Sequence, residues 1–304
     1  MDQALTPAGR ALRLAGHICR VGLGYIFLAS GALKSLDPEG FSGEVAQYGL
    51  LSGAFARSFA YLLIPIEVAV GAALLLNFRP ALTLSAATAL MVVFIGAIGY
   101  ALATDQPLHG CGCFGRFVVR TPVETLREDL AFLAAGLIGL FALRGVPGRG
   151  RFRSTMVAAV ALASGAFVIA SPHLPLDDVA TGVKPGAEWR DLGVALADVD
   201  LTRGAYLIAL LGMKDEASGA ALGTLNKLAE SGAVPILGLH GDDDEAYNEF
   251  FWSRGPAFPI YKVAPTDMKR MHRKLPRFFA VKDGRVVATW ETIPSAGEAQ
   301  AALR

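Results

Sequence analysis

The sequence predicts an α-helical membrane bundle followed by an α/β domain, and two observations along the chain indicate this. The chain of 304 residues is 53% hydrophobic and only 18% charged, with a mean hydropathy of +0.43, which is too apolar for an ordinary soluble protein. The apolar excess is confined to residues 12–172, whereas residues 173–304 have the composition of a globular domain. The net charge of +1 gives no indication of a nucleic-acid partner.

Five apolar runs in the first region are long enough to cross a bilayer core, which needs about 20 helical residues. They are Leu12–Leu33, Phe55–Asn77, Ala81–Ala103, Leu126–Leu143 and Thr155–Ser171. The first four predict a four-helix transmembrane domain over residues 1–150, and the fifth predicts an anchoring helix over residues 151–173. The first run is expected to be a signal anchor, because no A-x-A-like cleavage site follows it.

Basic residues between the runs predict the orientation in the membrane. They are Arg10 and Arg13 at the N-terminus, Arg79 in the second break, and Arg144, Arg149, Arg151 and Arg153 in the fourth break. Since positively charged loops stay in the cytoplasm, the N-terminus is expected there, at a bacterial inner membrane. With five spans, the third break and the C-terminal domain are then expected in the periplasm.

Proline and glycine residues over 174–186 predict an extended linker, followed by an α/β domain over residues 187–304. Continuous apolar runs at Ala205–Leu211 and Val234–Leu239 are typical of buried strands, and helical patterns follow each of them. These helical patterns cover Ala217–Glu230 and Glu245–Ser253, and Arg277–Val281 and Val286–Trp290 flank an Asp283-Gly284 hairpin turn. This β-α-β-α-β-β order, with Leu275-Pro276 before the hairpin, predicts the thioredoxin fold.

The break between the third and fourth runs contains the motif His109-Gly110-Cys111-Gly112-Cys113-Phe114-Gly115. Disulfides persist outside the cytoplasm, and a pair separated by one residue closes a small, strained ring that is easily reduced. The glycines permit the unusual backbone angles of such a ring. His109 could exchange a proton near neutral pH and favour the thiolate. Cys111, Cys113 and His109 are therefore candidate catalytic residues for thiol–disulfide exchange.

Two other interpretations of the cysteine motif remain. A structural bridge between such close neighbours closes almost no loop and therefore stabilises the fold little. A zinc site would have three ligands from the motif, but no fourth is evident nearby, so no metal is expected. The third cysteine, Cys19, lies in the first run roughly 20 Å from its outward end, and we expect it to be a packing residue.

A carboxyl group within a membrane helix is costly and indicates a function. Glu67 lies in the middle of the second run, two residues after Pro65. It could accept a proton during the reduction of a quinone bound in the bundle, which makes Glu67 and Arg20 candidate cofactor-binding residues. Alternatively, Glu67 could pair with Arg20 to fix the bundle. Lys34, at the outer end of the first run, is expected to extend its amine to the membrane surface.

The first 145 or so residues resemble the MauE/DoxX family of membrane proteins. The matching pieces are Phe27–Lys34 with Asp37-Pro38, Tyr48-Gly49-Leu50, Pro65-Ile66-Glu67 with Gly71, and Cys111-Gly112-Cys113-Phe114-Gly115. The last motif, between the third and fourth helices, is specific to the MauE side. The resemblance implies a role in methylamine utilisation of the kind that matures periplasmic proteins needing disulfides, methylamine dehydrogenase being the namesake.

The remainder resembles the MauD and TlpA-like proteins, in which a membrane anchor precedes a periplasmic thioredoxin-like domain. The chain is thus similar to a fusion of both proteins. It departs from them in one respect: Asp215-Glu216-Ala217-Ser218 occupies the position of their Cys-x-x-Cys pair, and no cysteine follows Cys113. Leu275-Pro276 matches the cis-proline loop that contacts the substrate chain in active relatives. The resemblance implies partner binding by Leu275 and Pro276, although Pro276 could merely shape a turn.

Three functions compete on this evidence. The first is a membrane thiol–disulfide oxidoreductase that couples Cys111 and Cys113 to a quinone and acts on a periplasmic client or a separate thioredoxin-like partner. The second is a non-catalytic assembly factor, in which the cysteine-free domain docks a client or redox partner. A small-molecule transporter ranks last, because the two halves of the bundle show no matching pair of broken helices.

Overall fold

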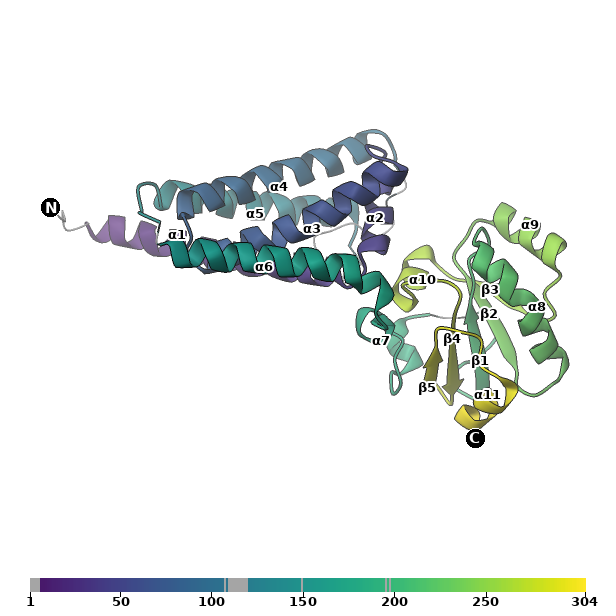
Figure 1. Ribbon diagram of the computed structural model, residues 1–304. Helices are drawn as coiled ribbons and strands as arrows, with labels where there is room; N and C mark the ends of the chain where they lie inside the picture. Colours follow the sequence, from purple (N-terminus) through teal and green to yellow (C-terminus); the bar gives the residue numbers. More distant parts are fainter. Residues whose placement is uncertain (1–5, 107, 109–119, 149, 195, 197) are drawn as a thin grey trace. The chain divides into compact units, whose positions relative to one another are not determined.

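The computed structural model describes residues 6–106, 108, 120–148, 150–194, 196 and 198–304. Contacts within the chain divide it into two compact units, Met1–Leu174 and Pro175–Arg304. The first unit is helical and the second contains a sheet (Figure 1).

The five long helices of the first unit coincide with the five predicted runs. The long helices are α1 (Pro7–Ser35), α3 (Gly53–Leu75), α4 (Pro80–Ala103), α5 (Pro122–Ala142) and α6 (Arg151–Ala170), which continues into the 3₁₀ turn η2 (Ser171–His173). The short helix α2 (Pro38–Gln47) was not predicted. It begins where the Asp37 side chain accepts a hydrogen bond from the Gly40 N–H and Pro38 takes the first helical position.

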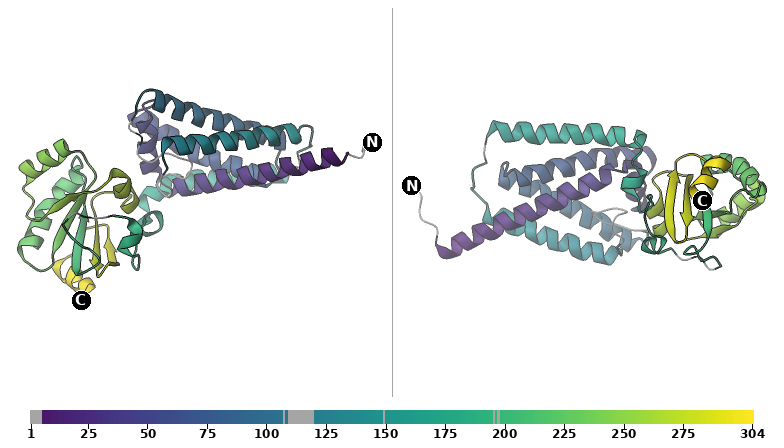
Figure 2. Two further views of the ribbon diagram at one scale, coloured as in Figure 1. Left: turned by 180° about the vertical axis from the view of Figure 1, so that it is seen from behind. Right: turned by 90° about the horizontal axis from the view of Figure 1, so that it is seen from below.

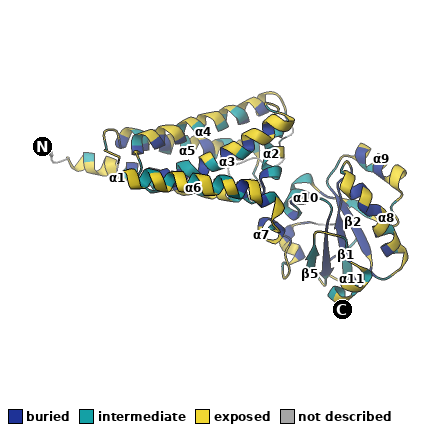
Figure 3. Ribbon diagram, viewed as in Figure 1, coloured by how far each residue is buried: buried dark blue, intermediate teal, exposed yellow. Residues whose placement is uncertain are grey.

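Four described helices are long and apolar enough to cross a membrane: α1, α3, α4, and α6 with its continuation to His173. Helix α5 lies at the fourth predicted run but is not among these four helices. Its first two turns carry Glu124, Arg127, Glu128 and Asp129. Helix α6 packs against α3, yet most of its surface is exposed, as expected for a helix facing lipid (Figures 2 and 3).

The second unit is built on a five-stranded sheet in the order β3-β2-β1-β4-β5. The strands are β1 (Ala205–Leu210), β2 (Ile236–His240), β3 (Ile260–Lys262), β4 (Arg277–Lys282) and β5 (Arg285–Trp290). The pairs β1–β2 and β2–β3 are parallel, whereas β4 is antiparallel to both β1 and β5. Asp283 and Gly284 both have positive φ, which confirms the predicted two-residue hairpin turn.

Helices cover both faces of this sheet. Helices α8 (Glu216–Glu230), α9 (Asp244–Arg254) and α11 (Ala296–Leu303) contribute to the core cluster on one face, and α10 (Pro265–Met271) with the 3₁₀ turn η3 (Trp189–Leu192) contributes to the cluster on the other. Alternate residues of β1 enter these two clusters, Leu207 on the first face and Ile208 on the second. The predicted β-α-β-α-β-β order is confirmed, with β3, α10 and α11 as additional elements.

The segment 174–186, predicted as an extended linker, is instead mostly part of the second unit, which begins at Pro175. It contains the short helix α7 (Asp177–Ala180). The buried Arg277 of β4 donates hydrogen bonds to Asp178, to the Thr181 hydroxyl and to the Val183 carbonyl. A buried guanidinium needs such acceptors, and this requirement folds the proline- and glycine-rich segment onto the sheet.

Candidate functional site

The predicted catalytic residues His109, Cys111 and Cys113 lie outside the described residues. The structure does describe the helices to which their segment is joined. Helix α4 ends at Ala103, and α5 begins after Thr121, whose side chain forms a capping box with Glu124. The cysteine motif is therefore attached to the end of the bundle where α4 finishes and α5 starts.

Glu67 of α3 is paired with Lys34 of α1, and the predicted pair with Arg20 is wrong. The Lys34 Nζ lies 2.7 and 2.9 Å from the two carboxylate oxygens of Glu67. The Ser30 hydroxyl donates to Glu67 Oε2 at 3.0 Å. Glu67 is 1% exposed and Lys34 is 7% exposed, so the prediction that Lys34 extends to the membrane surface is also wrong. Burial of both charges is stable only because each neutralises the other.

Close packing of α1 on α3 creates this pair. A Cβ atom added to Gly71 would lie 2.6 Å from the Leu28 backbone nitrogen, and one added to Gly31 would lie 2.5 Å from a Val68 methyl group. These glycines let the two backbones approach, as small residues do between membrane helices. The approach brings Ser30 and Lys34, one turn apart on α1, to Glu67.

Arg20 serves a different part of α3. Its guanidinium donates to the Leu74 carbonyl and, at 3.4 Å, to the Leu75 carbonyl. The last carbonyls of a helix have no partner within it, so Arg20 caps the C-terminus of α3. Seven residues separate Glu67 from Leu74, which is about 10 Å along the helix. The structure therefore does not bring the two predicted cofactor-binding residues together.

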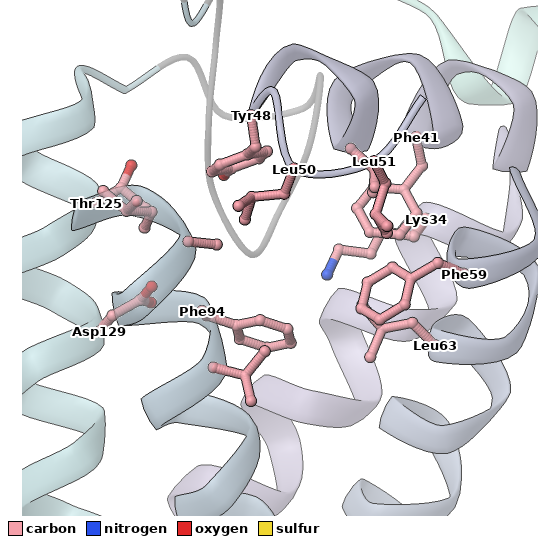
Figure 4. Close-up of a pocket in the computed structure, with 14 residues that line it drawn as sticks. Lys34, Phe41, Tyr48, Leu50, Leu51, Phe59, Leu63, Phe94, Thr125 and Asp129 are labelled. Carbon is pink, nitrogen blue, oxygen red and sulfur yellow. The ribbon is translucent and has the colours of Figure 1, made fainter. Parts of the chain in front are cut away.

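A cavity of about 300 Å³ lies beside the ion pair in the first unit. It is lined by Lys34, Phe41, Val45, Tyr48, Leu50, Leu51, Phe59, Leu63, Val93, Phe94, Ala97, Ile98, Thr125 and Asp129. Figure 4 shows the Lys34 nitrogen directed into this space and the Asp129 carboxyl group on the opposite side. The Lys34 nitrogen also lies 4.6 Å from the centre of the Phe41 ring and 5.5 Å from that of Phe94, distances at which cation–π attraction holds the amine in place.

Asp129 and Thr125 were missed from the sequence as site residues. Both are buried on α5, at 1% and 2% exposure. Asp129 lies within the predicted fourth run, and a carboxyl group in such a run is itself an indication of function. The adjacent Arg127 and Glu128 hid this indication, because the three together resemble a charged helix end.

Cys19 lies in α1 and is a free thiol of intermediate exposure. Its Cβ would be 3.7 Å from a Cβ added to Gly139 of α5. It therefore faces another helix of the bundle, in accordance with the packing role expected from the sequence.

In the second unit, Asp215 and Ser218 occupy the start of α8, where relatives are expected to carry cysteines. Asp215 is the N-cap, and its Oδ2 accepts from the Ser218 backbone N–H at 2.8 Å and from the Ser218 hydroxyl at 2.7 Å. Ser218 is fully buried, and its hydroxyl oxygen also accepts from the Gly212 N–H. A hydrogen-bonded pair thus stands where a disulfide is expected.

The Leu275-Pro276 peptide bond is cis, in agreement with the predicted cis-proline loop. The Leu275 side chain approaches Gly212, since a Cβ added to Gly212 would lie 3.1 Å from Leu275 Cδ1. The loop is therefore next to the segment that leads from β1 into α8. Asp215 and Pro276 lie at the same edge of the second unit.

Charged side chains surround the start of α8. Lys214 donates to Asp243, the N-cap of α9, at 2.9 Å. This hydrogen bond and the charge of Asp243 raise the pKa of Lys214. The Ala246 backbone N–H, followed by Lys214, lowers the pKa of Asp243. The Asp242 carboxylate accepts from the Met213 backbone N–H, and the Asp215 carboxylate accepts from the Ser218 N–H. Carboxylates therefore bind the backbone both before and at the start of α8.

Comparison with known proteins finds a family match that lies within the first unit. The family described as methylamine utilisation protein MauE matches residues 12–142. Protein TlpB of Flavobacterium psychrophilum is 30% identical over 108 residues, which are 35% of this chain and 27% of the relative. The chain thus spans about a quarter of that relative's length.

A solved thioredoxin-related protein from Neisseria meningitidis serogroup B is 14% identical, with a TM-score of 0.30. The similarity covers 36% of this chain and 90% of that one. The N-terminal region is thus similar to the MauE family, and the C-terminal region is an α/β domain with the strand order β3-β2-β1-β4-β5. The apolar helices and the MauE similarity indicate that the chain is a membrane protein.

Proposed function

We propose that the protein is a membrane thiol–disulfide oxidoreductase that supports disulfide formation in periplasmic proteins. The observation that carries this proposal is the location of the cysteines. Two of the three lie in the Cys111-Gly112-Cys113 motif of the MauE-type domain. The thioredoxin-like domain has Asp215 and Ser218 at its own cysteine positions. Disulfide exchange by this protein would therefore depend on Cys111 and Cys113.

The proposed location is the bacterial inner membrane, with the cysteine motif and the second unit in the periplasm. Helix α5 is 21 residues long, about 31 Å at 1.5 Å per residue, which matches the hydrocarbon core. Its charges are confined to its first two turns, so they would lie toward the periplasmic end of the span. The bundle then has five spans, and the arginine-rich N-terminus and fourth break lie in the cytoplasm.

In the proposed reaction, a thiolate of the partner attacks the Cys111–Cys113 disulfide and forms a mixed disulfide. The second partner thiolate resolves it, so the partner gains a disulfide while Cys111 and Cys113 become thiols. His109 would accept and return the proton of a thiol. A separate thioredoxin-like protein or a client protein would supply the dithiol.

The thioredoxin-like domain would contribute binding in place of chemistry. Its cis-proline loop lies beside the start of α8, and this edge is the proposed docking place for the partner. The same observation favours the second candidate function, a non-catalytic assembly factor, because a domain with Asp215 and Ser218 can hold a client without reacting with it.

Redox titration tests the main proposal. The purified full-length protein, with Cys19→Ala to leave two thiols, is equilibrated in glutathione buffers and alkylated. We expect the pair to change state within the range of known exchange proteins, about −120 to −270 mV. A pair that remains in one state at every potential would contradict the proposal.

Complementation separates catalysis from assembly. Exported proteins of a deletion strain are compared by differential alkylation after complementation with the wild-type gene or with Cys111→Ser/Cys113→Ser. An oxidoreductase requires the variant to leave as many free thiols as the deletion. Complementation to the wild-type level would instead support the assembly factor.

A further inference from the structure

We propose that the cavity beside Lys34 binds the ring of a membrane quinone, the electron acceptor for Cys111 and Cys113. This inference rests on the proposed function and adds the acceptor's binding site. The described residues that line the cavity come from α1, α2, α3, α4, α5 and the segment after α2. Three properties of the cavity indicate that its ligand is a quinone.

The first property is an aromatic lining inside a membrane domain. Phe41, Tyr48, Phe59 and Phe94 contribute rings, and the remaining walls are mostly aliphatic. Flat rings of a ligand stack on such side chains. A volume of about 300 Å³ is at the lower end of the range for small-molecule sites. It suits a ring system whose isoprenoid tail leaves toward the lipid.

The second property is the placement of polar groups on two sides. Lys34 directs its ammonium group into the cavity from α1, and Asp129 lies opposite on α5 (Figure 4). A quinone has two oxygens at opposite ends of its ring, so Lys34 can donate to one of them, and the Asp129 carboxyl group can accept from the other once reduction gives it an O–H. A fatty acyl chain has no polar group that would contact Asp129 opposite Lys34. The arrangement therefore favours a quinone over a lipid tail.

The third property is a carboxylate that holds the donor in place. Glu67 contacts Lys34 at 2.7 and 2.9 Å, so the ammonium group stays charged and oriented although it is buried. Glu67 does not line the cavity itself. Lys34 is thus the donor to the ligand, and Glu67 is a positioning residue that keeps Lys34 charged and oriented.

The redox step balances with this acceptor. Two S–H bonds of Cys111 and Cys113 break and one S–S bond forms, which releases two electrons and two protons. The quinone takes both and becomes a quinol with two O–H bonds. Lys34 donates a hydrogen bond to one oxygen, the Asp129 carboxyl group accepts one from the O–H formed at the other, and the two thiols supply both protons. Thr125, in the cavity wall, is one helical turn beyond Thr121, which follows the cysteine segment closely in the chain.

The test uses full-length protein in nanodiscs and decylubiquinone as the probe. Binding is measured as the excess of decylubiquinone in protein-containing discs over empty discs. Wild-type protein and Cys111→Ser/Cys113→Ser should bind equally, whereas Lys34→Met/Glu67→Gln should bind at least tenfold more weakly. Because that double variant changes a buried pair, Ala97→Phe provides a second test. It fills the cavity and leaves the ion pair intact.

The matched control for Ala97→Phe is Val92→Phe, on the exposed surface of the same helix, which should bind like wild type. Unchanged binding by both Ala97→Phe and the Lys34→Met/Glu67→Gln variant would overturn the inference. Equal affinity for an alkylbenzene without carbonyl groups would also overturn it, in favour of a lipid site. Failure of the redox titration together with intact decylubiquinone binding would refute the proposed function and leave the cavity assignment standing.

Discussion

The two units differ in which part of a disulfide site they keep. In the second unit, the helix start and the cis-proline loop remain, but Asp215 and Ser218 form a hydrogen bond in place of a disulfide. The first unit keeps two neighbouring cysteines in its sequence and adds a buried ion pair and a cavity to its bundle. The comparison indicates that the second unit forms its helix start and cis-proline loop without a cysteine pair.

The units also stabilise their buried cations differently. Lys34 depends on the carboxylate of Glu67, with Phe41 and Phe94 nearby. Arg277 is 2% exposed and donates to Asp178, Thr181, and the carbonyls of Met271 and Val183. Burial lowers the pKa of Arg277, and the neighbouring Asp177 and Asp178 oppose this shift. Lys34 is therefore stabilised by one carboxylate, whereas Arg277 donates hydrogen bonds to several acceptors.

The largest expected effect is the formation of a disulfide in the second unit when cysteines are introduced at positions 215 and 218. The side chains of Asp215 and Ser218 already meet, with 2.7 Å between Asp215 Oδ2 and the Ser218 hydroxyl oxygen, so cysteine side chains at these positions can approach each other closely enough to bond. Asp215→Cys/Ser218→Cys should therefore form an intramolecular bond in a background with Cys19→Ala, Cys111→Ser and Cys113→Ser. Alkylation with and without reductant measures it, and each single cysteine variant serves as the control. If the two thiols do not form a disulfide, the start of α8 does not have the geometry of a thioredoxin-type cysteine pair.

The next effect concerns the buried pair of the first unit. Glu67→Ala leaves the Lys34 charge without its carboxylate, which costs about 3–5 kcal/mol. Denaturant unfolding in mixed micelles measures this loss. Glu39→Ala is the control, because the Glu39–Arg57 pair is exposed and such pairs contribute at most about 1 kcal/mol. Lys34→Met/Glu67→Met should recover most of the stability, and equal losses for Glu67→Ala and Glu39→Ala would contradict the role of the pair.

The sequence was sufficient for local elements and insufficient for contacts between them. Long helices and the Asp283-Gly284 turn follow from patterns within one segment, so they were predicted correctly. The Lys34–Glu67 pair depends on the register of α1 against α3, which Gly71 and Gly31 set through backbone contacts. Neither helix specifies that register alone, because each glycine acts only through its contact with the other helix. For the same reason Arg20 was assigned the wrong partner.

Short elements and buried acids escaped prediction for a different reason. Strand β3 has three residues, too few for a period of two to be recognised. Asp129 was hidden among neighbouring charges, and its burial follows only from the packing of α5 in the bundle. The segment 174–186 was predicted as a linker because nothing local shows that Arg277, which follows Thr181 by 96 residues and Val183 by 94, recruits its acceptors there.

A smaller effect is expected for Asp178→Ala in the second unit. Asp178 has a 47% exposed side chain, and Arg277 keeps three other acceptors without it. We expect a loss of about 1–2 kcal/mol, less than for a fully buried charged hydrogen bond. All three tryptophans lie in this unit, so tryptophan fluorescence reports its unfolding. Glu188→Ala, in the exposed pair with Arg285, is the control. A loss as large as that of Glu67→Ala would show that the shared acceptors do not compensate.

The smallest effect is a pH dependence of the second unit through His240. Burial lowers the pKa of His240, with opposing contributions from Asp242 and Asp244 and a further lowering by Lys262. Below the unfolded-state pKa of about 6.5, the unfolded chain therefore binds a proton that the folded chain does not. Stability is lost as the pH falls through this window, with a slope of at most about 1.4 kcal/mol per pH unit.

His240→Phe should flatten this slope while keeping the ring contact with Tyr247, whose centroid lies 4.9 Å away. Tryptophan fluorescence during denaturant unfolding at pH 5, 6, 7 and 8 measures the difference. The variant and wild type should differ least in slope between pH 7 and 8, where His240 is neutral in both states. Equal slopes for both proteins between pH 7 and 5 would mean that the imidazole takes up its proton in the folded state, and that its buried position does not oppose the charge.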